Sequence, residues 1–124
     1  MKAFNSIIPR VTHTCNGRII TFGLSQEENI LIENMVDSKN IEVYETNVAS
    51  DLVALRSTAI VVNAKKLEAD DLELLENYYT ELGPWVEEIV FWIGSPKPTI
   101  ELQILFKCFD KFDDMITAFE KIVI

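Results

Sequence analysis

The sequence predicts a three-layer α/β/α domain: a doubly wound, five-stranded parallel sheet of order 2-1-3-4-5 between two layers of helices. Five short apolar segments alternate with helix-like segments, which is the pattern of βαβ units. The runs at 18–22, 59–62 and 89–93 are largely apolar, as in central strands covered on both faces, whereas 41–46 alternates like an edge strand. Right-handed crossovers leave few topologies, and the doubly wound order fits this arrangement.

The first half of the chain supplies two strands and two helices. The first strand is expected at 18–22 (RIITF). Ser25 and Glu28 have the spacing of a capping box, in which each side chain satisfies the other residue's free backbone N–H, so a helix should begin there and run to about Val36. The second strand is expected at 41–46 (IEVYET), followed by a brief helix after Ser50 and Asp51.

The second half repeats the alternation. Strands are expected at 59–62 (AIVV), 89–93 (IVFWI) and 104–109 (ILFKCF). The helix between the first two has acidic residues in its first turn, where they suit the helix dipole, and Gly83 and Pro84 stop it. Asp110 is expected to cap a last helix whose apolar face extends to Val123.

The connection at 94–103 (GSPKPTIELQ) is short and contains two prolines. A crossover helix with its loops needs about a dozen residues. Either the fourth helix is shortened, or the fifth strand begins early and pairs differently. A short helix would leave part of the sheet uncovered, and Phe4, Ile7, Ile8 and Val11 have no other assignment. Residues 1–17 are therefore expected to pack on the domain as an added strand or a strap.

Composition narrows the possible partners. The chain has 124 residues, enough for one domain, and a formal net charge of −9. Binding to nucleic acid or an anionic membrane requires clustered Lys and Arg, so neither is expected. No stretch reaches the roughly 20 apolar residues that span a bilayer, and a signal-peptide-like N-terminus is not evident. The two cysteines lie in unlike contexts, which fits a reducing cytoplasm.

Motifs for catalysis or cofactor binding are incomplete. The turn after the first strand is Gly-Leu-Ser-Gln, unlike a phosphate loop, and there is no GxSxG elbow. His13 and Cys15 are two potential ligands, fewer than a zinc site takes. Glu27 and Glu28 could attract a metal at the carboxyl end of the sheet, but a stabilised helix start explains them better. Neither a metal nor a cofactor is therefore expected.

The stretch Phe106-Lys107-Cys108-Phe109-Asp110, followed by the helix KFDDMITAFEKIV, resembles the end of response-regulator receiver domains. In that family a strand closes on Lys-Pro-Phe, and the last helix has a similar apolar rhythm. The first strand and the acidic helix after it also resemble a receiver. The resemblance covers about residues 18 to 124 in layout and implies the receiver fold, with a shortened fourth helix.

The resemblance implies a degenerate receiver pocket made of Gly23, Leu24, Asn63, Ser95 and Lys107. Receivers hold Mg²⁺ with two acidic residues where this chain has Gly23 and Leu24. Asn63 stands at the position of the phosphoacceptor aspartate, and an amide cannot accept a phosphoryl group. Ser95 lies near the switch Ser/Thr position, Lys107 matches the phosphoryl-contacting lysine, and a cysteine follows it where the family has proline.

Two classes of function remain open. The first is a non-catalytic signalling or regulatory domain that resembles a receiver, cannot be phosphorylated, and binds a protein partner or a second copy. The alternative is a small flavodoxin-like enzyme or ligand-binding domain that uses unconventional groups at the carboxyl end of the sheet, such as Ser25, Asn63, Ser95 and Lys107. The first class is favoured because every recognisable site is incomplete.

Overall fold

The computed structural model describes residues 17–124, and the expectation for the N-terminal segment lies outside this range. The strands are β1 Arg18–Phe22, β2 Glu42–Thr46, β3 Ala59–Asn63, β4 Ile89–Ile93 and β5 Lys107–Phe109. The helices are α1 Gln26–Val36, α2 Asp51–Ala54, α3 Ala69–Leu82, α4 Ile100–Leu105 and α5 Phe112–Val123. Three short 3₁₀ turns lie at η2 Asp37–Lys39, η3 Ala64–Lys66 and η4 Gly83–Trp85.

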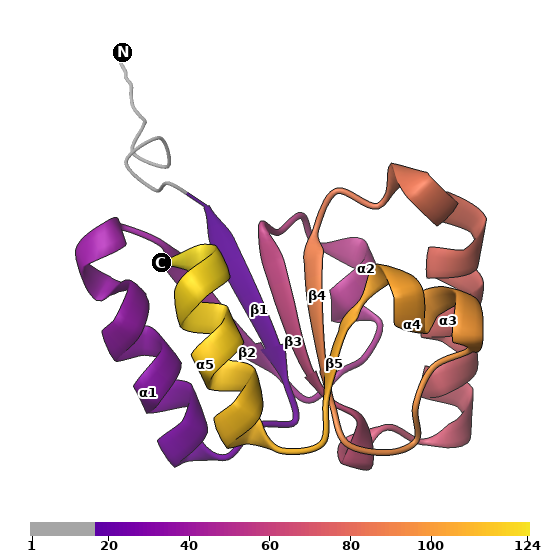
Figure 1. The fold of residues 1–124 in the computed structure, drawn as a ribbon, viewed down its shortest axis with the longest axis horizontal. Helices are drawn as coiled ribbons and strands as arrows, with labels where there is room; N and C mark the ends of the chain where they lie inside the picture. Colours follow the sequence, from indigo (N-terminus) through magenta and orange to yellow (C-terminus); the bar gives the residue numbers. More distant parts are fainter. Residues whose placement is uncertain (1–16) are drawn as a thin grey trace.

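The five strands form one parallel sheet of order β2-β1-β3-β4-β5, which confirms the predicted topology (Figure 1). All strands run in the same direction, so the loops that follow them gather at one end of the sheet. We call this the carboxyl end and the opposite one the amino end. The alternating strand β2 is an edge strand, as its half-solvated pattern predicts.

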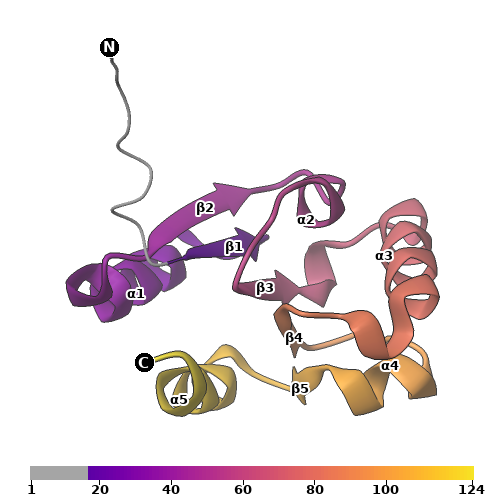
Figure 2. The same cartoon turned by 90° about the horizontal axis from the view of Figure 1, so that it is seen from above.

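Helices cover both faces of the sheet. Figure 2 shows α1 and α5 on one side and α2, α3 and α4 on the other. Because successive strand residues point to opposite faces, β1 supplies Ile20 and Phe22 to the core under α2–α4 and Ile19 to the core under α1 and α5. The strands β3 and β4 divide their residues in the same way, which is why their runs are continuously apolar.

The first helix begins as the sequence predicts. The Glu28 backbone N–H donates to Ser25 Oγ at 3.1 Å, and the Ser25 N–H donates to Glu28 Oε1 at 2.9 Å. Both halves of the capping box are therefore present, and the Glu28 carboxylate is used by the helix start. Within the core, Thr21 Oγ1 donates to Asn29 Oδ1 at 2.6 Å, which provides a partner for two buried polar groups.

The segment expected to be the start of the fifth strand is helical instead. Residues 100–105 form α4, and β5 begins only at Lys107. The run ILF fits a strand as well as a helix, because short apolar runs do not distinguish the two structures. Leu102 is buried while Ile104 is 81% exposed. In a strand, residues two apart would lie on the same face, so this difference in burial fits a helix. The shortened fourth helix is confirmed, and with Phe106 it covers the sheet where a gap was expected.

The expected cap of the last helix is wrong. The N-cap residue of α5 is Lys111, and no side chain caps it. Asp110 lies one residue further back, and its Oδ1 is 3.3 Å from Lys97 Nζ. Asp113 and Asp114 provide negative charge in the first turn instead.

Candidate functional site

Gly23 closes the turn between β1 and α1 at the carboxyl end of the sheet. Its φ is +73°, a conformation that favours glycine. A Cβ on Gly23 would lie 2.8 Å from both Cβ and Cγ of Lys66 in the turn after β3. The Lys66 stem therefore packs directly on the Gly23 backbone. This is where the receiver comparison expects a metal-binding carboxylate, and the space beside Gly23 is filled by a lysine stem.

Asn63, the last residue of β3, ties the same two turns together. Its Nδ2 donates to the Gly23 carbonyl oxygen at 3.0 Å, and its Oδ1 accepts from the Lys65 N–H at 3.3 Å. The amide thus uses a donor and an acceptor at once, and a carboxylate lacks the donor. Asn63 is therefore suited to hold the turns together and not to receive a phosphoryl group.

Leu24 and Ser95 occupy different surroundings at the same end of the sheet. Leu24 is half-buried and packs against the core beneath α1 and α5. Ser95 is exposed in the loop after β4. Trp92 Nε1 holds this loop by donating to the Pro96 carbonyl oxygen at 2.9 Å. The pair Gly23 and Leu24 offers no side-chain metal ligand, so the residues present do not fit the carboxylate-held Mg²⁺ of receivers.

Lys107 does not join these residues. In the parallel register Asn63 is level with Ile93 and Ile93 with Phe109, whereas Lys107 is level with Phe91. Two residues along a strand place Lys107 about 7 Å short of the carboxyl end. Its side chain is exposed. The sequence match assigned it to the pocket, but the structure brings only Gly23 and Asn63 into direct contact.

Two lysines other than Lys107 lie near the carboxyl end of the sheet. Lys66 packs on Gly23, and Lys97 pairs with Asp110. The signal for Lys66 is its position in the Asn63-Ala64-Lys65-Lys66 stretch, because residues just after a parallel strand gather at this end of the sheet. The stretch alone does not show that Lys66 packs on Gly23.

Within residues 17–124, no three His, Cys, Asp or Glu side chains are grouped so that they could hold a metal. None of the described helices is long and apolar enough to cross a membrane. Glu27 and Glu28 line a small hollow with Lys111.

The helix α4 exposes apolar side chains next to the edge strand β5. Ile100 and Ile104, four residues apart on α4, are 74% and 81% exposed, and Leu105 is also exposed. We call Ile100, Ile104 and Leu105 the α4 patch. Cys108 on the adjoining β5 is half-buried, and burial raises the pKa of its thiol, against the opposing charge of Lys97. A thiol of this kind is less ionised at neutral pH than an ordinary cysteine.

No protein-family model matches this sequence, and no curated protein matches it. Solved structures do match. The pseudo-receiver domain of the CikA protein is 15% identical with a TM-score of 0.55, covering 85% of this chain and 93% of that one. NtrX from Brucella abortus, determined in complex with ATP, is 14% identical with a TM-score of 0.52, covering 85% of this chain and 26% of that one.

A third match is a chain in which a yeast Spc42 trimeric coiled-coil segment is fused to another structure. It is 10% identical with a TM-score of 0.51, and the match covers 86% of this chain and 78% of that one. Identities this low establish the fold alone, which agrees with the strand order and the two helix layers of this chain. The chain therefore has the receiver-like α/β fold, shared with the pseudo-receiver domain of CikA and with part of NtrX.

Proposed function

We propose that this chain is a cytoplasmic, non-catalytic signalling domain that cannot be phosphorylated and acts by binding protein. The observation that carries the proposal is the contact of Lys66 and Asn63 with Gly23. These contacts fill the space beside the Gly23 turn with the chain's own side chains. Phosphotransfer to a receiver needs a carboxylate acceptor and a bound metal that neutralises the transferred charge. Here the acceptor is replaced by an amide whose two ends are already hydrogen-bonded.

Phosphate acceptance is tested with acetyl phosphate and Mg²⁺, followed by intact mass spectrometry. We expect no phosphoryl adduct. The matched variant Asn63→Asp restores an acceptor carboxylate but not the metal ligands, so it should also stay unmodified. A stable acyl phosphate on the unaltered chain would overturn the proposal. An adduct on Asn63→Asp alone would show that the missing carboxylate is the only defect and that the closed turn does not prevent the reaction.

The binding part of the proposal rests on the α4 patch and the free edge of β5. Side chains four residues apart lie on one side of a helix, so Ile100 and Ile104 form a continuous apolar surface. Such a surface differs from single exposed apolar residues, which are common on proteins. The strand β5 has three residues and an open hydrogen-bonding edge. A partner that covers the patch would bury Ile100 and Ile104 together, and a second copy of the chain is the first partner to test.

Sedimentation velocity over a range of concentrations measures self-association, and a photo-crosslinking residue at position 104 detects another partner. We expect one of these readouts to be positive and to be lost in Ile100→Glu. Val48, which is 55% exposed in the loop after β2, provides the matched control as Val48→Glu and as a second crosslinking position. Monomeric behaviour with no crosslink specific to position 104 would exclude the α4 patch as the binding surface.

A further inference from the structure

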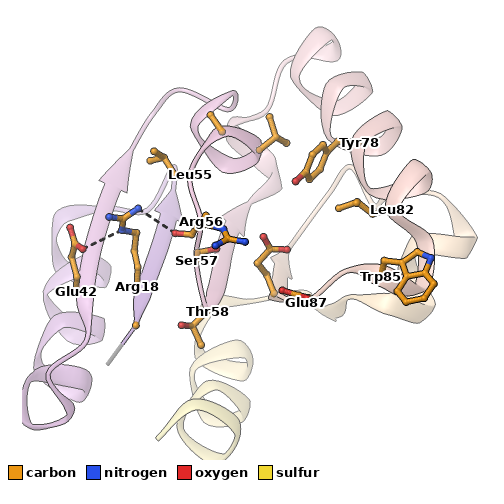
Figure 3. Close-up of a pocket in the computed structure, with 14 residues that line it drawn as sticks. Arg18, Glu42, Leu55, Arg56, Ser57, Thr58, Tyr78, Leu82, Trp85 and Glu87 are labelled. Carbon is orange, nitrogen blue, oxygen red and sulfur yellow. Dashed lines mark hydrogen bonds and ion pairs between the residues drawn. The ribbon is translucent and has the colours of Figure 1, made fainter. Parts of the chain in front are cut away.

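A groove of about 930 Å³ lies at the amino end of the sheet, opposite the end that holds Gly23 and Asn63 (Figure 3). One wall is the segment before β3, and the other is formed by α3, η4 and the segment before β4. Tyr78 and Leu82 are four residues apart on α3 and project toward the groove, and Trp85 stands at its outer rim. One wall therefore presents aromatic and apolar side chains, as the surfaces that bind other proteins commonly do.

The indole of Trp85 is presented to solvent. Trp85 is 80% exposed, whereas Trp92 is 1% exposed and packs in the core. Tryptophan is enriched where proteins bind one another, because its large flat ring gains much free energy when a partner covers it. The face of an indole also attracts a cation such as an ammonium or a guanidinium group. Trp85 therefore suits a partner that brings apolar and cationic groups together.

The wall that carries Trp85 has charges of one sign. Between Lys66 and Lys97 the chain has no basic residue, and it has eight acidic ones: Glu68, Asp70, Asp71, Glu73, Glu76, Glu81, Glu87 and Glu88. This stretch includes α3, η4 and the segment before β4, and its last two acidic residues line the groove. A surface with one sign of charge attracts partners of the opposite sign and repels those of its own.

The opposite wall does not neutralise these carboxylates. Arg18 Nε pairs with Glu42 Oε1 at 3.2 Å, so these two charges satisfy each other. Arg56 is the other cation of the lining, and within residues 17–124 no ion pair joins it to Glu87 or Glu88. Among the described lining residues, two carboxylates therefore face one cation, and a basic group of a partner would restore the balance.

We infer that this groove binds a basic, amphipathic segment of a partner protein. Apolar side chains of the segment contact Tyr78, Leu82 and Trp85, and its lysine or arginine side chains contact Glu87 and Glu88. The carboxylates select a cationic partner, and the indole provides the main apolar contact. The groove is a second binding surface, since no residue of the α4 patch lines it. The inference therefore does not depend on the proposed function.

The probe is a short fluorescent peptide of alternating lysine and leucine, and its binding to the full chain is measured by fluorescence anisotropy at an ionic strength of about 0.15 M. Two matched peptides differ from it in one property each: glutamate replaces lysine in one, and serine replaces leucine in the other. We expect the lysine–leucine peptide to bind more tightly than either. Absence of binding, or equal binding of the lysine–serine peptide, overturns the inference.

Variants of the chain locate the binding surface. Trp85→Ser should weaken the binding of the lysine–leucine peptide about thirtyfold, and Glu87→Gln combined with Glu88→Gln should weaken it about tenfold. The matched control is Glu27→Gln combined with Glu120→Gln, which removes the same charge from exposed positions on α1 and α5 and should leave the affinity unchanged. Equal weakening in the two double variants would show that net charge alone attracts the peptide, which overturns the inference.

Folding, self-association and the α4 patch are controlled on the same samples. Circular dichroism confirms that each variant is folded. Association of the chain with itself that disappears in Trp85→Ser would place a second copy in the groove, which overturns the assignment to a basic partner. Ile100→Glu alters the α4 patch and should bind the peptide like the unaltered chain. Loss of peptide binding in Ile100→Glu would place the peptide on the α4 patch and overturn the inference, whereas failure of the α4 patch to bind any partner would leave the groove result unchanged.

Discussion

The two ends of the sheet differ in how their loops meet. At the carboxyl end, the turns after β1 and β3 touch: Lys66 packs on Gly23, and the Asn63 amide donates to the Gly23 carbonyl oxygen. At the amino end, the segment before β3 and the helix α3 stand apart and leave a groove of about 930 Å³ with Trp85 at its rim. The turn at Gly23 is filled by the chain's own side chains, whereas the segments at the amino end leave a groove between them.

In open parallel sheets, ligands ordinarily bind at the carboxyl end. This chain keeps the strand order that creates such a site and then fills it with backbone and side chain contacts. Among the described residues a groove lies at the opposite end of the sheet, and a smaller hollow beside Glu27, Glu28 and Lys111 is left at the carboxyl end. Topology positions the loops of this fold, and the loop residues decide what fits between them.

The largest effect is expected for Gly23→Ala. An alanine at positive φ costs about 1–2 kcal/mol, and the contact with the Lys66 stem adds an overpacking term of about 1–3 kcal/mol. The free energy of unfolding in urea should fall by about 2–5 kcal/mol. Gly94→Ala is the control, since Gly94 has a similar φ of +79° but its nearest neighbour, Asp110 O, is 4.0 Å from the added Cβ. Equal losses in the two variants would mean that Lys66 does not close the turn.

The next effect is expected for Asn63→Asp. The carboxylate cannot donate to the Gly23 carbonyl, so the unfolding free energy should fall by about 1–3 kcal/mol at neutral pH. Repulsion from this oxygen raises the pKa of the new carboxyl in the folded chain above its unfolded value of about 3.9. The loss of unfolding free energy should therefore be absent below about pH 3.9 and grow as the pH rises through the folded pKa. Denaturant unfolding as a function of pH measures this.

The control for Asn63→Asp is Asn34→Asp on the exposed face of α1, which should change stability by no more than about 0.5 kcal/mol at any pH. If both variants behave alike, the Asn63 amide contributes no specific bond at the carboxyl end, and the contrast between the two ends weakens.

A smaller change in stability is expected for Tyr79→Phe, near the amino end of the sheet. Its ring is 2% exposed, and its hydroxyl has no partner among the described residues. Tyr79→Phe should leave stability unchanged or raise it by up to about 1 kcal/mol, because an unpaired buried hydroxyl is removed. The control Tyr44→Phe removes a surface bond to Asp51 and should reduce stability slightly. A large loss in Tyr79→Phe would reveal a hydroxyl partner near the groove.

The same tyrosine predicts an alkaline effect. Burial, followed by the charge of Glu88, raises the pKa of Tyr79 above its ordinary value. A raised acid pKa means that folding disfavours the phenolate, so the unaltered chain should lose stability as the pH rises above about 10, and Tyr79→Phe should lose less.

The smallest effect is expected for Lys107→Met. Lys107 is exposed and lies away from the Gly23–Asn63 contact, so the unfolding free energy should change by no more than about 0.5 kcal/mol. Lys97→Met, which breaks an exposed ion pair with Asp110, should also change it by less than about 1 kcal/mol. A larger loss for Lys107 would give it a role at the carboxyl end that its register does not indicate.

Local patterns were sufficient for most of the fold. The apolar runs at β3 and β4 predicted central strands, the alternation at β2 predicted an edge, and Ser25 with Glu28 predicted the start of α1. The run at 104–106 was misassigned, because three apolar residues suit a strand and a helix equally. Only packing decided between them: the helix buries Leu102 and Phe106 beneath α3 and turns Ile104 outward.

The sequence by itself determined the strand order, the two layers of helices and the absence of receiver carboxylates at positions 23, 24 and 63. These depend on residue type and on period, which are local properties. The tertiary structure alone decided that Lys66, and not Lys107, meets the turn at Gly23, that Asn63 bonds to that turn, and that a groove opens at the amino end. Each of these depends on strand register and on the approach of segments some 40 residues apart, which no local pattern encodes.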